Sequence, residues 1–283
     1  MRVTVATELA QKVKKTNGRW FNGYTREHVI EKLRVVFDVE KNLEQDANGA
    51  TIKIHNLSEK SRGVLARIPA HMHLEAGYDD NLHTIYKGDI TSASSKREGP
   101  NWVTTIKCGT GANAKHAIAN TTFKSNVNTK TVITDMAKTM GLHIPKSIAD
   151  AKGMLKSITN EGIVLQGPAL PQMNKVLGPR GYKASIQDDA LVIVKRGGVR
   201  MAEAVLVAQR TGMIGSPELS SPDDSKSKPN VKAKMLIAPD IVAGGLIKIE
   251  SLRISGTYGV DKVRHIGDTH GAAWYSELEG FPV

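Results

Sequence analysis

Residues 244–280, GGLIKIESLRISGTYGVDKVRHIGDTHGAAWYSELEG, are the stretch that decides the fold predicted from the sequence. Ile247 and Ile249 alternate with charged neighbours, which is the period of a strand with one buried face. Residues typical of strands continue past Gly259, and the chain resumes at Trp274 after two further glycines. We therefore expect three consecutive strands joined by turns that contain glycine, the first of these turns at Gly259.

A similar phrase occurs much earlier in the chain. Gly99 and Trp102 in GPNWVTTI correspond to Gly271 and Trp274 in GAAWYSEL, and both phrases read Gly-x-x-Trp-x-(Ser/Thr)-x-(Ile/Leu). In each case the Trp opens a segment with the composition of a strand. We expect the two tryptophans to occupy equivalent positions in two related, superimposable β-domains, one at each end of the chain, and to contribute to the core or to turns.

The N-terminal third has the pattern of an antiparallel β-domain. Apolar residues alternate with polar ones in several short segments, at 33–39, 51–54, 72–76, 83–92 and 102–108. Polar or glycine-bearing turns join them, and a helix is expected after Ser58. Parallel pairing would require helical crossovers, so these strands predict an antiparallel sheet or barrel over residues 1–110.

The middle of the chain predicts a small α+β module over residues 111–198. Val132, Met136 and Met140 share one face of a helix that ends before a glycine, and a second helix is expected to begin at Pro171. Two apolar segments at 182–186 and 191–194 flank an Asp-Asp pair and predict a hairpin. The fold class expected for the whole chain is therefore mainly β with an α+β insert.

The second β-domain is expected over residues 199–283, and it contains the most polar, turn-rich stretch of the chain, SPELSSPDDSKSKPN at 216–230. We predict that this stretch is a long exposed loop that becomes ordered only against a neighbouring protein. The residues predicted to contact that partner are Ser216, Glu218, Asp223, Asp224, Lys226 and Lys228.

Composition and charge restrict the classes of function. Hydrophobic content of 40% and charged content of 24% are ordinary for a globular protein. A net charge of +11 raises nucleic acid or an acidic protein as a partner, but no run of Lys and Arg forms a basic tail. A nucleic-acid-binding β-barrel, the alternative function, should interleave basic residues with exposed aromatics, yet aromatic residues make up only 5% of the chain.

Cysteine usage and hydropathy suggest an intracellular site of synthesis. A single cysteine, Cys108, excludes an internal disulfide and fits a reducing compartment. The N-terminal residues lack the apolar core of a signal peptide. The most apolar later stretch, 235–249, is interrupted by Pro239, Asp240 and Lys248, so we expect no membrane insertion.

The residues that could carry chemistry give no catalytic pattern. His265, Asp268 and His270 lie close together, but the two histidines point to opposite faces if they share a strand, and no further ligand has metal-binding spacing. His71 and His73 share the polar face of a predicted strand, which favours a solvated or interface surface. Phosphate-binding loops, nucleophile elbows and paired-cysteine zinc motifs are absent from the sequence. We assign no catalytic, cofactor or metal residues, and expect no enzyme.

The order of several phrases resembles the bacteriophage tail baseplate hub family. FDV at 37–39, IKIHNLS at 52–58, LEAGY at 74–78 and IYKGDI at 85–90 are similar to the first domain of these hubs. QRTGMIGSP at 209–217, MLIAP at 235–239, GTY at 256–258 and HIGDTHGAAW at 265–274 are similar to the last domain. The resemblance covers nearly the whole chain in the order that the family has.

This resemblance implies a structural virion protein with two tail-tube-like antiparallel β-barrels flanking the small module. Three copies would present six barrels, so that a threefold hub caps the sixfold tail tube. The implied partners are further copies of the chain, the tail tube protein and the central spike protein, with baseplate wedge and tape-measure proteins around them. DNA would pass through the channel on ejection, and the hub would be assembled in the host cytoplasm.

Overall fold

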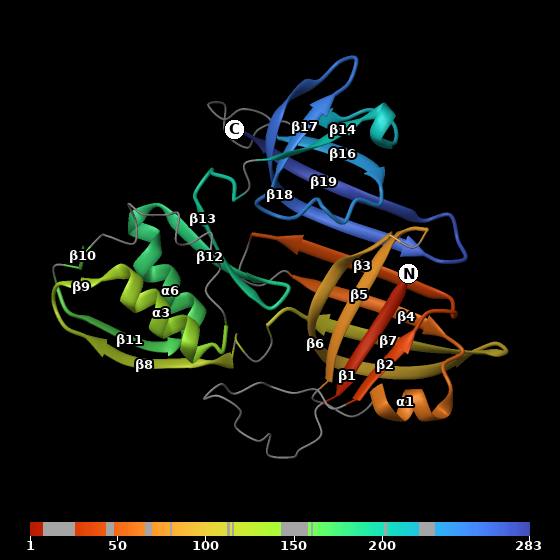
Figure 1. Cartoon of the computed structure of the whole chain (residues 1–283), viewed down its shortest axis with the longest axis horizontal. Helices are drawn as coiled ribbons and strands as arrows, with labels where there is room; N and C mark the ends of the chain where they lie inside the picture. The colour runs from red at the N-terminus through yellow and green to blue at the C-terminus, as the bar shows by residue number, and fades with distance from the viewer. Residues whose placement is uncertain are drawn as a thin grey trace.

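The computed structural model describes residues 1–7, 26–43, 48–65, 70–79, 81–111, 114, 116–142, 158–159, 161–200, 203–220 and 230–283. Within this part of the chain, 13 strands form one sheet and three two-stranded sheets lie apart from it. The chain is therefore mainly β, as the sequence predicts. In Figure 1 the first strands, drawn in red and orange, lie beside the last strands, drawn in blue, and the α+β module stands to one side.

The large sheet contains both ends of the chain. Its strands are β1 (Arg2–Thr7), β2 (Arg26–Ile30), β3 (Val35–Asn42), β4 (Gly49–His55), β5 (Ala70–Tyr78), β6 (Asn81–Glu98), β7 (Asn101–Gly109), β14 (Ala204–Ala208), β15 (Glu218–Leu219), β16 (Val231–Leu236), β17 (Leu246–Glu250), β18 (Ser255–Asp268) and β19 (Trp274–Pro282). The main path runs β15-β16-β19-β18-β3-β4-β7-β6-β5-β1-β2, and β17 with β14 branches from β18. All pairs are antiparallel except β14 with β17.

The expectation of two separate closed barrels is not met in this form. One long strand, β18, pairs with β17 through its first half and with β3 through its second half, so that the two end units share a sheet. Among the described strands the path ends at β15 and β2 without closing on itself. The turn predicted at Gly259 is wrong for a related reason, because β18 continues through this glycine while the Phe281 ring packs over its backbone.

The two end units nevertheless repeat one pairing pattern. β4-β7-β6-β5 in the first unit and β16-β19-β18-β17 in the last have the same order. Each long strand carries a register shift, between Ile90 and Ser92 in β6 and at the matching place in β18. Counted in residue pairs from each register shift, the Arg97–Trp102 pair and the Gly267–Trp274 pair hold the same position. The tryptophans thus stand on corresponding rungs, although within one sheet rather than in two separate barrels.

The α+β module contains two helices packed beside two-stranded sheets, of which one, β12–β13, is a hairpin. Its elements are β8 (Ile118–Phe123), β9 (Val127–Asn128), α3 (Thr129–Thr139), β10 (Ile158–Thr159), β11 (Ile163–Pro168), α6 (Ala169–Leu177), β12 (Tyr182–Gln187) and β13 (Ala190–Lys195). The Asn128 side chain accepts a hydrogen bond from the N–H of Lys130 and caps α3. Both predicted helices are confirmed, as is the hairpin at 182–194. In the first unit, α1 (Glu59–Leu65) confirms the helix expected after Ser58.

Buried apolar side chains form three clusters. One draws almost entirely on residues 3–108, one on residues 114–191 and one on residues 207–278. The first cluster also receives Ile237 and contacts Trp274, both from the last unit. Phe37 and Trp274 meet edge to face with ring centroids 5.6 Å apart, over the bare backbone of Gly267. The contact between the end units is therefore apolar packing as well as strand pairing.

A β-hairpin joins the module to the first unit. Asp188 and Asp189 form its two-residue turn, with φ values of 48° and 62°. The Lys41 Nζ atom donates to Asp188 Oδ2 at 2.6 Å, and the Lys87 backbone N–H donates to Asp188 Oδ1 at 3.0 Å. The side chain of Lys41 is only 4% exposed. In Figure 1 the β12–β13 hairpin reaches from the module toward the large sheet.

Two further polar contacts hold the same hairpin. Asn48 donates from Nδ2 to the Ile186 carbonyl at 3.0 Å and accepts the Asn42 N–H at 2.7 Å. His71 Nε2 lies 2.9 Å from Asp189 Oδ2, and its Nδ1 lies 3.4 Å from Asp89 Oδ1. Burial alone would lower the pKa of His71, but the hydrogen bonds to these two aspartates outweigh it and raise the pKa to about 9.

The two tryptophans should differ in their contribution to stability. Trp274→Ala should lower the free energy of unfolding by about 3 kcal/mol, because it removes a large ring from the Phe37 contact. Trp102→Ala should cost less than about 1 kcal/mol, since the ring is 39% exposed. Urea denaturation followed by circular dichroism measures both, and equal losses would contradict the different environments described above.

The Lys41–Asp188 pair gives a second prediction. Asp188→Asn should destabilise the chain by about 3 kcal/mol, because the Lys41 charge stays buried without its counter-ion. Adding Lys41→Met should recover most of this loss, since the uncompensated charge is then removed. Chemical denaturation of both variants makes the comparison. A double variant no more stable than Asp188→Asn alone would show that the hairpin depends on shape rather than on this charge balance.

His71 makes part of the stability dependent on pH. The pKa of His71 is about 9 in the folded chain and about 6.5 in an unfolded one, so its contribution is fully present below about pH 6.5 and is lost as the pH rises through about 9. Wild-type protein should therefore exceed His71→Gln in melting temperature at pH 6, and the difference should shrink by pH 10. A difference that stays constant over this range would exclude protonation of His71 as its source.

Candidate interface surfaces

The corresponding tryptophans lie in different surroundings. Trp102 is 39% exposed, and the Arg62 guanidinium lies 4.3 Å from its ring centroid. Of the two expected positions, core or turn, Trp102 therefore has the one beside a turn, whereas Trp274 packs against the first core cluster. Trp274 also lines a shallow hollow of 510 Å³ with Met1, Leu33 and the turn before β19. The Trp274 ring is partly buried, whereas the Trp102 ring is exposed and therefore available to a partner.

The turns that precede the tryptophans also differ. Gly99 has a φ of 59° in the two-residue turn between β6 and β7, a conformation that favours glycine. Gly271 belongs to a longer turn, where its N–H donates to the Asp268 carbonyl at 3.2 Å and a Cβ would meet the Asp268 side chain. Both glycines are therefore needed by their turns, but for different reasons.

Opposite charges form a regular ladder across four strands, β16, β19, β18 and β3. Cations from β16 and β18 alternate with carboxylates from β19 and β3, and neighbours across strands lie within ion-pair distance. The four cations are Lys232, Lys234, Lys262 and Arg264, and the four carboxylates are Asp38, Glu40, Glu277 and Glu279. We call this surface the charge ladder. Its eight charges sum to zero.

Arg264 lies at the centre of the charge ladder. Its Nε and Nη2 atoms donate to the two carboxylate oxygens of Asp38 at 2.8 and 2.5 Å, and its Nη1 lies 3.9 Å from Glu277. The hydrogen bonds to Asp38 are the main cause that raises the pKa of Arg264. Strand pairing places Arg264 opposite Glu277 on one side and Glu40 on the other, so these side chains share a face of the sheet.

The polar stretch at 216–230 differs from the prediction at its ends. Glu218 and Leu219 form strand β15, which pairs with Lys232 and Val231, and the Ser220 N–H donates to the Asn230 carbonyl at 2.8 Å. These residues are thus ordered by the chain's own β16. Ser216 and Glu218 are exposed, and their contact with a partner stays a prediction. The other predicted contact residues, Asp223, Asp224, Lys226 and Lys228, lie outside the described residues.

The residues considered for chemistry are occupied by structural contacts. His265 is buried on the sheet and bonded to Ser276 Oγ at 2.8 Å, and burial, with the nearby Lys41 charge, lowers its pKa to about 3. Asp268 is held by Arg34, whose hydrogen bond lowers the pKa of that carboxyl. Burial raises the pKa of the Cys108 thiol to about 12. Among the described residues, no group of three or more His, Cys, Asp or Glu side chains could hold a metal ion.

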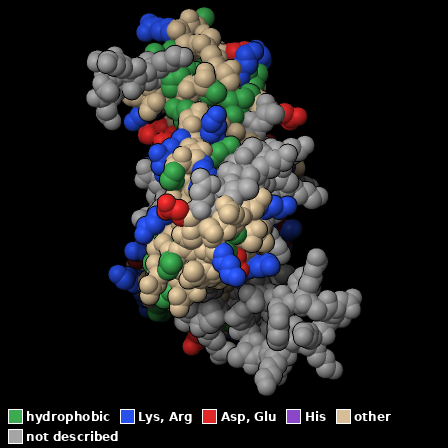
Figure 2. All heavy atoms as spheres, turned by 90° about the vertical axis from the view of Figure 1, so that its left-hand side faces the viewer, with side chains coloured by type: hydrophobic (Ala, Val, Ile, Leu, Met, Phe, Trp, Pro, Cys, Tyr) green, Lys and Arg blue, Asp and Glu red, His purple; other side chains and the backbone are tan. Residues whose placement is uncertain are grey.

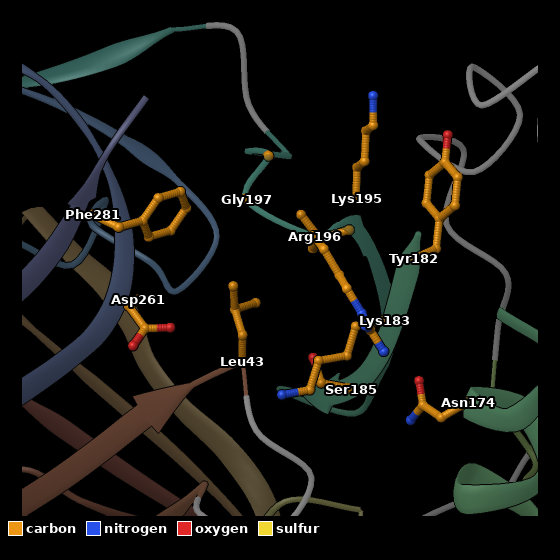
Figure 3. Close-up of a pocket in the computed structure, with 12 residues that line it drawn as sticks. Leu43, Asn174, Tyr182, Lys183, Ser185, Lys195, Arg196, Gly197, Asp261 and Phe281 are labelled. Atoms are coloured by element: carbon orange, nitrogen blue, oxygen red, sulfur yellow. The ribbon is translucent and has the colours of Figure 1, made fainter. Parts of the chain in front are cut away.

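A cavity of 390 Å³ lies between the β12–β13 hairpin and the last unit. Figure 3 shows Tyr182, Lys183 and Arg196 on the hairpin side, and Phe281 and Asp261 across from them. Sequence reasoning missed this site, since its walls come from segments far apart in the chain, at residues 43, 174–198 and 261–281. Only the basic residues that close the hairpin, KRGG at 195–198, could have indicated it.

The basic excess is not gathered in one band on the face seen in Figure 2. Lys and Arg side chains stand at several separate places there, with acidic side chains between some of them. Nucleic acid binding by a basic stripe gains no support from this face. No helix in the described ranges has the length and apolar character needed to cross a membrane.

Several solved structures share the fold of this chain, among them tail proteins. The 43 kDa tail protein of prophage MuSo2 from Shewanella oneidensis is 7% identical, with a TM-score of 0.64 over 99% of this chain and 96% of that one. A tail protein from Neisseria meningitidis MC58 is 9% identical, with a TM-score of 0.64 over 99% and 95%. The E. coli c3393 protein, a type VI secretion component, is 8% identical, with a TM-score of 0.57 over 89% and 75%.

A family model identifies the chain more specifically than these folds do. No curated protein sequence matches it. The comparisons also give no support to a nucleic-acid-binding β-barrel. The model described as "Baseplate hub gp41" matches residues 18–280, which is most of the chain and includes both repeated units and the module between them. The chain therefore belongs to the baseplate hub gp41 family of bacteriophage tail proteins.

Proposed function

We propose that three copies of this chain form a closed hub ring that joins the sixfold tail tube to the threefold central spike. The observation that carries the proposal is the repeated four-strand pattern, with matching register shifts and matching tryptophan rungs. Each chain offers two such units, so three chains offer six to a sixfold ring. Residues 1–110 and 199–283 are the two units, and residues 111–198 are the module between them.

The outer strands of the sheet supply the contacts between copies. β2 and β15 end the described path, and such edges carry backbone groups that can pair with another chain. Identical chains close a ring through heterologous contacts, so the first unit of one copy meets the last unit of the next. Tail tube and spike proteins bind the two sides of the ring, and wedge and tape-measure proteins are further neighbours. The hub assembles in the host cytoplasm and has a structural, not a catalytic, role.

The charge ladder is the surface best suited to face passing DNA. Each phosphate that Lys or Arg neutralises adds salt-dependent affinity, so a channel wall with unpaired cations would retain DNA. On the charge ladder every cation lies within ion-pair distance of a carboxylate on the next strand. A chain with a net charge of +11 thus has one extended face without excess charge.

The ring predicts a stoichiometry. A reconstruction of the assembled particle without imposed symmetry, or quantitative mass spectrometry of purified tails, should give three copies at the tail axis. First and last units should alternate around the ring. The isolated chain is free to be a monomer, because the tube or spike can template the ring. Six copies, or one, at the axis would exclude the proposal.

The charge ladder predicts a gain of DNA affinity. Glu277→Gln with Glu279→Gln removes the partners of Lys232 and Lys234, so affinity for a short DNA duplex should rise at low salt. The slope of log K against the logarithm of the salt concentration should steepen by about 2. The matched control is Glu98→Gln with Glu161→Gln, two exposed carboxylates elsewhere in the chain. Fluorescence anisotropy measures both variants. An equal gain of DNA affinity in the two double variants would contradict the prediction, because it would show that only the total charge of the chain matters.

A further inference from the structure

The 390 Å³ cavity beside the β12–β13 hairpin combines apolar side chains with three basic side chains and one carboxylate, that of Asp261. Leu43 from the end of β3 and Phe281 from β19 contribute apolar surface, and Tyr182 stands opposite them (Figure 3). Lys183 and Arg196 lie on the hairpin wall, with Lys195 beside them. Its volume lies within the range of about 300–1,000 Å³ that is typical of ligand pockets.

Some cations elsewhere in the molecule have carboxylate partners, whereas among the described residues those of this cavity do not. Elsewhere Lys41, Lys262 and Arg264 each have a carboxylate partner at 2.9 Å or less. In the described part of the chain, no carboxylate lies within 4.0 Å of the side-chain nitrogens of Lys183, Lys195 or Arg196. Three cations without ion pairs beside a concave surface give a local positive potential that favours an anionic ligand.

The hairpin wall of the cavity is fixed before any ligand binds. Asn174 of α6 accepts the Ala184 N–H at 2.7 Å and donates to the Ala184 carbonyl at 2.9 Å, which ties the helix to β12. The Arg196 N–H donates to the Gly181 carbonyl at 2.8 Å and closes the open end of the hairpin. A preformed wall lowers the entropy lost on binding.

We propose that this cavity binds an acidic peptide segment that also carries an aromatic or aliphatic side chain. Carboxylates of the segment pair with Lys183 and Arg196, and its apolar side chain packs against Leu43 and Phe281. A phosphate group or a nucleic acid backbone would satisfy the cations but leave the apolar lining uncovered. That the segment belongs to a neighbouring baseplate protein rests on the proposed hub function.

Peptide binding to the full-length purified chain tests the proposal. The probe is a fluorescein-labelled hexapeptide with four glutamates and two phenylalanines, and the reference probe has glutamine in place of each glutamate. Anisotropy titrations should show saturable binding of the acidic probe that weakens with salt. Lys183→Glu with Arg196→Glu should reduce the affinity about tenfold. Phe281→Ala should also weaken binding while leaving the salt dependence unchanged.

The matched control is Lys124→Glu with Lys130→Glu, which makes the same change of charge at two exposed residues outside the cavity. This control should change the affinity less than about threefold. The proposal is overturned if both double variants lose the same affinity, or if the acidic probe shows no saturable binding. It is also overturned if a short single-stranded DNA binds more tightly at the same residues. The assay uses isolated protein, so it succeeds or fails independently of the copy number that tests the hub ring.

Discussion

The ion pair between the buried Lys41 and the partly exposed Asp188 is the contact on which the arrangement of the three units depends. Lys41 lies in β3, which pairs with β4 of the first unit and with β18 of the last. Asp188 lies at the tip of the module's hairpin and also accepts the Lys87 N–H. Removing two charges from water costs several kcal/mol each, and the pair repays this only with good geometry and extra hydrogen bonds. We infer that the pair fixes where the hairpin docks more than it adds stability.

The two repeated units share their strand pairing, but the environments of their corresponding side chains differ. The rungs of the long hairpins still correspond, yet Trp274 is packed against Phe37 while Trp102 is exposed beneath Arg62. The reason lies in β18, whose second half pairs with β3 and thereby brings the first core against Trp274. The backbone pattern is thus common to both units, whereas the side chains that each unit exposes to its neighbours differ.

Local patterns in the sequence predict the strands, helices and hairpin well because each depends on short-range alternation or helical spacing. What the patterns miss is long-range pairing. Nothing in the composition of β18 shows that one half pairs with β17 and the other half with β3. The role of Lys41 had a readable signal, since it stands at the next inward position after Val35, Phe37 and Val39. A lysine at a core position predicts a buried partner, but not that the partner is Asp188.

The distribution of charge follows from which strands pair with each other. Strands β16, β19, β18 and β3 lie side by side, so alternating signs on adjacent strands neutralise each other across a regular sheet face. The β12–β13 hairpin pairs with no other described strand, and its basic residues have no acidic strand beside them. Part of the excess positive charge therefore remains at the junction of the module with the last unit, where no described strand of the sheet neutralises it. A neighbour that brings carboxylates to this junction would complete there the charge balance that the charge ladder achieves within the chain.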